Sequence, residues 1–190
     1  HDALAYNSPL FGGWDTRSVT SMARMFARTA YSDATASTTQ TWNTASVKDF
    51  TSMFEGSVDF TAAISQWDTS SATTMEAMFK NASSFTSDLA WDTSSVTSMA
   101  YMFYGASTFN QDISHWDVSK VTDLHETFRG ATSFNTPLND WDVSRVKTME
   151  RMFKDAAVFN QPLSAWRTSS VTSLQETFKD AISFNQPLPW

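Results

Sequence analysis

Residues 91–117 read WDTSSVTSMAYMFYGASTFNQDISHWD, and residues 116–142 read WDVSKVTDLHETFRGATSFNTPLNDWD, so nearly the same segment occurs twice in succession. The eight tryptophans mark the period. They stand at positions 14, 42, 67, 91, 116, 141, 166 and 190, which are 24 to 28 residues apart. The chain is therefore a series of seven repeats of about 25 residues. A unit of this size has to stack on its neighbours to bury its apolar side chains.

Within one repeat, apolar residues recur at steps of three and four, as on the buried face of a helix. Val96, Met99 and Phe103 follow this spacing, and Asp92 precedes them as a residue that caps free amides at a helix start. After Gly105 the apolar residues are spaced as in an extended segment. The predicted fold class is α/β: a leucine-rich-repeat-like solenoid of about seven coils, each a short helix plus a short extended segment. A solenoid of helical hairpins fits less well, because FNQDIS and FNTPLN contain the poor helix formers Asn and Pro.

The repeats predict one domain. Residues 1–13 form an N-terminal lead-in, and residues 14–190 form a single solenoid domain. The first repeat (14–41) is degenerate and cap-like, because it lacks the Phe-Asn pair of later repeats. Trp190 ends the last repeat without a polar cap, so end-to-end or assembly contacts are expected at this uncapped C-terminal face.

Composition excludes several classes of protein. The net charge of −7 and the absence of a basic run argue against nucleic acid as a partner. No window approaches the roughly 18 apolar residues of a membrane span, so no membrane insertion is expected within this segment. With no cysteine there is neither a disulfide nor a thiolate metal site.

Two rows of residues follow from stacking the repeats. An asparagine row of Asn110, Asn135, Asn160 and Asn185 is expected to hydrogen-bond along the stack. An aspartate row has one carboxylate in five of the seven coils, and Asn43 and Arg167 stand at the equivalent places of the other two. Local capping of backbone amides is the favoured interpretation of this second row, and calcium bound between coils is the alternative. The candidate calcium ligands are Asp68, Asp92, Asp117 and Asp142.

A third row lies directly after the repeated phenylalanine and differs from coil to coil. It consists of Lys80, Tyr104, Arg129, Lys154 and Lys179. A row of this kind is usually a solvated face, but it is also the candidate partner-binding surface. Its cations would suit an acidic partner, either a polyanionic glycan or an acidic protein surface.

The repeated words VTSMAYMFYGASTFNQDISHWDVS resemble the BspA-type leucine-rich-repeat surface proteins, whose repeat has the form W-D-x-S-x-V-x-x-M-x-x-M-F-x-x-A-x-x-F-N-x-x-L. The resemblance covers residues 14–190. It implies an extracellular or cell-surface location and a role as an adhesin or binding scaffold, with no catalytic residues to carry over.

Residue chemistry also argues against an enzyme. The histidines are His1, His115 and His125, which share no repeated partner, and no nucleophile elbow, P-loop or zinc-binding motif is present. No cofactor is expected. Two functions therefore remain open: a non-catalytic extracellular binding and adhesion scaffold with a protein or glycan partner, or a structural or linker subunit of a larger protein assembly.

Overall fold

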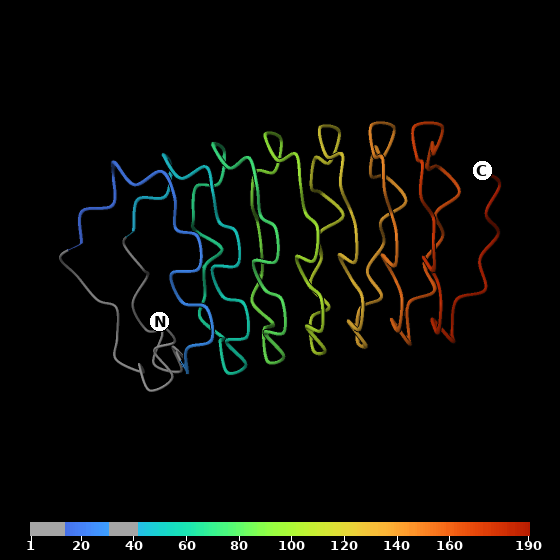
Figure 1. The fold of residues 1–190 in the computed structure, drawn as a ribbon, viewed down its shortest axis with the longest axis horizontal. Coiled ribbons are helices and arrows are strands. Elements are labelled where there is room, and N and C mark those ends of the chain that lie inside the picture. The colour runs from blue at the N-terminus through green and yellow to red at the C-terminus, as the bar shows by residue number, and fades with distance from the viewer. Residues whose placement is uncertain (1–13, 31–41) are drawn as a thin grey trace.

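The computed structural model describes residues 14–30 and 42–190, and it contains no helix and no extended strand in these ranges. The described chain winds through successive coils that lie side by side from the N-terminal to the C-terminal end (Figure 1). Neighbouring coils meet in isolated parallel bridges. These bridges join Ser21, Asp49, Thr74, Ser98, Asp123, Thr148 and Ser173 in that order. The predicted fold class, a helix plus an extended segment in each coil, is therefore wrong, and so is the helical-hairpin alternative.

The segment expected to be a helix is a series of overlapping turns. The N–H groups of Met102, Tyr104 and Ala106 each donate to the carbonyl three residues earlier, at 3.0–3.1 Å. Tyr101 and Gly105 have φ of +59° and +65°, in the left-handed region that an α-helix excludes. A positive φ at the third residue of a turn is typical of type II turns. The apolar residues spaced at steps of three and four are therefore buried as predicted, but they belong to successive turns and not to a helix.

The remaining amides of this segment bind the next coil. Tyr101 N–H donates to His125 O at 2.8 Å, and Phe103 and Gly105 make equivalent bonds to the coil that follows. Alternate residues therefore direct their N–H groups to the next coil, while the residues between them close turns within their own coil. Every coil from 14–30 to 141–165 repeats this arrangement.

Aromatic rings fill the core in continuous rows. Phe103 lies 5.7 Å from Phe128 in the next coil and 3.9 Å from Phe109 in its own coil, with nearly parallel planes. Trp91 and Trp116 stack at 6.4 Å in a second row. The phenylalanines of these rows are fully buried from Phe54 to Phe159, and their burial supplies the main apolar stabilisation.

Polar side chains join the coils at their corners. Trp116 Nε1 donates to Leu89 O at 3.1 Å, and the later tryptophans repeat this bond. Asn135 Oδ1 accepts the backbone N–H of Asn160 at 2.9 Å, and the same bond links Asn110 to Asn135 and Asn160 to Asn185. The predicted asparagine row is therefore confirmed, with a backbone amide as donor.

Residues 14–30 stack directly on the following coil, because Met22 N–H donates to Asp49 O and Phe26 N–H to Met53 O, both at 2.9 Å. The predicted lead-in at 1–13, and residues 31–41 of the repeat predicted to be cap-like, lie outside the described residues. In the described part of the chain, no helix is long and apolar enough to cross a membrane.

Candidate functional site

One side of the stack carries the side chains that vary most in charge from coil to coil. In each coil the turn that begins at the left-handed residue brings that residue and the third residue after it to the same side. Tyr101 and Tyr104 are such a pair, with ring centroids 6.3 Å apart, while Met102 and Phe103 between them are fully buried. We call this side the charged face. Its members are Lys80, Tyr101, Tyr104, His125, Glu126, Arg129, Glu150, Arg151, Lys154, Glu176 and Lys179.

The cations of the predicted partner-binding row all lie on the charged face, and each is paired with a carboxylate. The closest pairs are Lys80–Glu55 at 3.7 Å, Arg129–Glu126 at 2.9 Å, Lys154–Glu176 at 2.6 Å and Lys179–Glu176 at 3.4 Å. The row is therefore charge-compensated. Sequence reasoning missed Glu126, Arg151 and Glu176, although the three-residue spacing of Glu126 from Arg129 and of Glu176 from Lys179 is a signal for such pairs.

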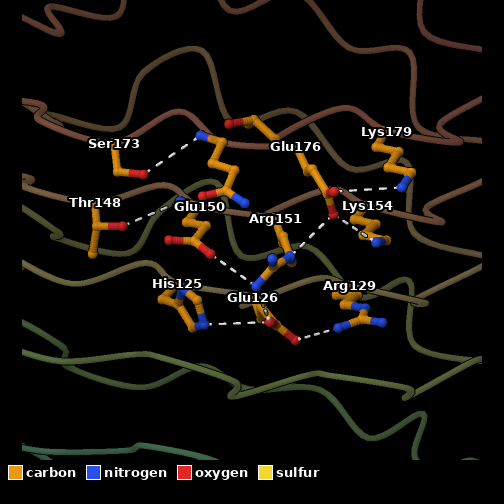
Figure 2. Close-up of polar contacts among 12 residues, drawn as sticks. His125, Glu126, Arg129, Thr148, Glu150, Arg151, Lys154, Ser173, Glu176 and Lys179 are labelled. Atoms are coloured by element: carbon orange, nitrogen blue, oxygen red, sulfur yellow. Dashed lines mark hydrogen bonds and ion pairs between the residues drawn. The ribbon is translucent and has the colours of Figure 1, made fainter.

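Glu126 is the most buried charge of this network. Its side chain is only 7% exposed, and its two oxygens contact Arg129 at 2.9 Å, His125 at 3.3 Å and Arg151 at 3.5 Å (Figure 2). A carboxylate this deeply placed has to be compensated, because removing it from water costs several kcal/mol. Arginines from its own coil and the next one supply that compensation.

Glu176 has a similar role two coils further along, in a more exposed position. It contacts Lys154, Arg151 and Lys179 (Figure 2). The hydrogen bond from Lys154, followed by that from Arg151, lowers the pKa of Glu176 from 4.5 to about 2. Arg151 thus joins Glu126 to Glu176, and the ion pairs run continuously across three coils.

Aromatic rings replace the ion pairs in the middle of the charged face. Lys80 Nζ lies 5.1 Å from the ring centroid of Tyr101 and 5.5 Å from that of Tyr104, and Arg129 Cζ lies 5.2 Å from Tyr104. The His125 ring packs edge-on against Tyr101 at 4.9 Å. All five side chains are half-buried. We call this group, Lys80, Tyr101, Tyr104, His125 and Arg129, the tyrosine patch.

The surroundings of the tyrosine patch are acidic. Burial, followed by the charges of Glu126, Asp123, Glu76 and Glu150, raises the pKa of Tyr101. Across residues 14–30 and 42–190, Glu76 and Asp123 have no cationic side chain within 4 Å. The surplus charge beside the patch is therefore negative.

The aspartate row lies elsewhere, and each member caps a local turn. Oδ1 of Asp68, Asp92, Asp117 and Asp142 accepts the backbone N–H of the serine two residues later, at 2.9–3.0 Å. Hydrogen bonds from this serine lower the pKa of all four. The described residues contain no group of three or more His, Cys, Asp or Glu side chains placed to hold a metal ion.

Apolar side chains gather on the coil of residues 166–190. Leu174 and Leu188 are about two-fifths exposed, and with Phe178 and Trp190 they line a hollow of about 390 Å³. This is the face at which the sequence predicts assembly contacts.

Comparison with known proteins gives one family. The family described as "Mycoplasma protein of unknown function, DUF285" matches residues 1–90, 28–115 and 89–190, which together span the chain. No curated protein and no solved structure matches.

Proposed function

Since the chain belongs to the DUF285 family, whose function is not known, we propose that it is a non-catalytic binding scaffold. Its repeated residues build the stack, and its variable residues, presented on the charged face, contact a partner. Location at the cell surface is part of the proposal, and its support is the resemblance of the repeat to BspA-type surface proteins.

The observation that carries the proposal is the tyrosine patch. Two half-buried tyrosines lie beside an arginine, and tyrosine and arginine are the residue types, with tryptophan, that dominate binding energy at protein interfaces. The ion pair with Glu126 holds Arg129 in place beside Tyr104, so less of this arginine's side-chain freedom is lost when a partner binds.

The proposal that the protein is not a catalyst is supported by the hydrogen bonds and ion pairs of its polar side chains. Asn135 and Asp117, which recur in other coils, each have a side-chain oxygen that accepts a hydrogen bond from a backbone N–H. Both oxygens of Glu126, next to His125, contact arginines.

The test uses the variant Tyr101→Ala/Tyr104→Ala. The fold tolerates alanine at both places, because Ala77 has the equivalent left-handed φ of +53° in the preceding coil and Ala27 occupies the position of Tyr104 in the first. The matched control is Val58→Ala/Val158→Ala, which removes exposed apolar surface away from the patch.

Binding of these three proteins to a panel of purified extracellular proteins and glycans is measured by biolayer interferometry. We expect at least one panel member to bind the wild type and the control equally, and the tyrosine variant at least about tenfold more weakly. The proposal fails if no panel member binds, or if the tyrosine variant binds as tightly as the wild type. Surface labelling of intact source cells with an antibody to the chain tests the location.

A second candidate function, a structural or linker subunit of an assembly, is supported by the apolar hollow on the last coil. Its marker is self-association: light scattering of the purified chain would give a mass above 21.3 kDa that falls to the monomer value in Leu174→Ser/Leu188→Ser.

A further inference from the structure

We infer that the tyrosine patch binds a basic segment of a protein partner, with an arginine or lysine side chain lying against Tyr101 and Tyr104 and between Glu76 and Asp123. This inference rests on the proposed binding function and specifies its partner. The sequence predicts an acidic partner, whereas this inference gives the partner the opposite charge.

The two rings already hold a cation. Lys80 Nζ is placed over both Tyr101 and Tyr104, at 5.1 and 5.5 Å from the centroids, within the range of cation–π attraction. Its ion pair with Glu55 is long, at 3.7 Å, and its side chain is 30% exposed. The geometry is therefore that of a cation acceptor, with Lys80 as its internal occupant.

The cations of the charged face are paired with carboxylates, whereas Glu76 and Asp123 have no cationic side chain within 4 Å among the residues that the structure describes. Arg129 and Arg151 both contact the buried Glu126. An acidic partner would have to break these pairs and leave Glu126 uncompensated, which is strongly unfavourable. A basic partner breaks none of them.

Glu76 and Asp123 come from different coils, on either side of the coil that bears the tyrosines. After burial, both carboxylates, with Glu126 and Glu150, raise the pKa of Tyr101, so their charges act at its hydroxyl group. The protein as a whole carries −7, which favours the approach of a basic partner from a distance.

The experiment measures fluorescence anisotropy of two labelled peptides with the full chain: an arginine- and lysine-rich peptide, and a matched peptide with glutamate at those positions. The variant is Glu76→Gln/Asp123→Asn, which keeps side-chain shape and the Asp123 Oδ1 acceptor for His125 N–H. The control is Asp59→Asn/Asp140→Asn, which removes the same charge from exposed positions away from the patch.

We expect the basic peptide to bind the wild type and the control, with at least about a tenfold loss in the Glu76→Gln/Asp123→Asn variant and at most about a twofold loss in the control. Thermal melting checks that all three proteins are folded. Tyr104→Leu, which removes the aromatic face and keeps an apolar side chain, is expected to weaken binding as well.

Preference for the acidic peptide, or equal losses in variant and control, would overturn the inference. If neither peptide binds but a neutral or acidic panel member binds in a tyrosine-dependent way, the binding function stands and the basic partner is wrong. If nothing binds in either experiment, both proposals fail.

Discussion

The backbone N–H of Tyr101 donates to the carbonyl oxygen of His125, 2.8 Å away in the next coil, from a residue whose φ is +59°. The left-handed conformation turns this amide out of its own coil. The equivalent residue has a positive φ in every described coil, although it is never glycine. These residues are Arg24, Ser52, Ala77, Tyr101, Glu126, Arg151 and Glu176. The inter-coil hydrogen bonds therefore stabilise a conformation that L-residues disfavour by about 1–2 kcal/mol.

The glycines at the second left-handed position give the first prediction. Gly105 and Gly130 have φ of +65° and +68°, but an added Cβ at Gly105 would collide with Oδ1 of Asn81, whereas at Gly130 its nearest neighbour would be 3.7 Å away. We expect Gly130→Ala to lower the free energy of unfolding by about 1–2 kcal/mol, and Gly105→Ala to lower it further. Urea denaturation followed by tryptophan fluorescence measures both. Equal losses would contradict the predicted clash.

The second prediction concerns the tryptophans that join neighbouring coils. Trp141 is buried, and its Nε1 donates to Ile113 O at 3.1 Å. Trp141→Phe leaves that carbonyl without its donor and leaves a void, so we expect a loss of about 2–4 kcal/mol in urea denaturation. Val58→Ala, at a side chain that is 47% exposed, is the control and should change stability by less than about 0.5 kcal/mol.

The asparagine row gives the third. Asn135→Ala removes the acceptor for Asn160 N–H, and we expect it to cost about 0.5–1.5 kcal/mol. Asn135→Asp retains an oxygen in the same place and should cost less near neutral pH. Hydrogen exchange at Asn160 would show the local effect: faster exchange in the alanine variant only. Unchanged exchange there would mean that the bond contributes nothing.

The buried carboxylate gives the fourth. Glu126→Gln keeps the shape but removes the charge that Arg129 and Arg151 face, so we expect a loss of about 1–3 kcal/mol. In a double-mutant cycle with Arg129→Met the two effects should not add, because the residues form one pair. Full additivity in calorimetry would show that they are energetically independent.

The fifth prediction concerns the stability of the protein at acid pH. Ser94 lowers the pKa of Asp92 below 3.8, the other capping aspartates behave alike, and the pKa of Glu176 is about 2 instead of 4.5. A lowered folded-state pKa contributes stability that is fully present above the unfolded value and is lost as pH falls through the folded one. The urea midpoint should therefore fall between about pH 5 and about pH 2. Glu176→Gln should flatten this decline, and an unchanged slope would contradict the assigned pKa.

Much of the packing could be predicted from the sequence. Val96, Met99 and Phe103 are buried, as their spacing predicts. Asn135 is hydrogen-bonded to Asn160 of the next coil, as the recurrence of asparagine at this position predicts. The backbone could not be predicted, because a helix and a series of turns with left-handed residues both repeat apolar positions at steps of three and four. Only φ distinguishes them, and Tyr101 and Glu126 carry no residue-type signal for a positive φ.

The candidate site was half predictable for a similar reason. The row of Lys80, Arg129 and Lys179 was visible because these residues follow the repeated phenylalanine. The carboxylates that compensate it come partly from another position of the repeat, as Glu126 does for Arg129, and partly from another coil, as Glu55 does for Lys80. Without the stacking geometry, the cations alone suggested an acidic partner.

In the backbone–backbone hydrogen bonds between coils, the segment from Ser98 to Gly105 directs its N–H groups only toward the following coil and its carbonyls only toward the preceding one. A β-strand, in contrast, presents both groups on each edge. The peptide dipoles of this segment therefore point the same way in coil after coil and add along the stack, as they do along a helix. A coil placed in the reverse orientation would oppose amide to amide and carbonyl to carbonyl. The stack consequently has a built-in direction, and repeats can be joined in only one sense.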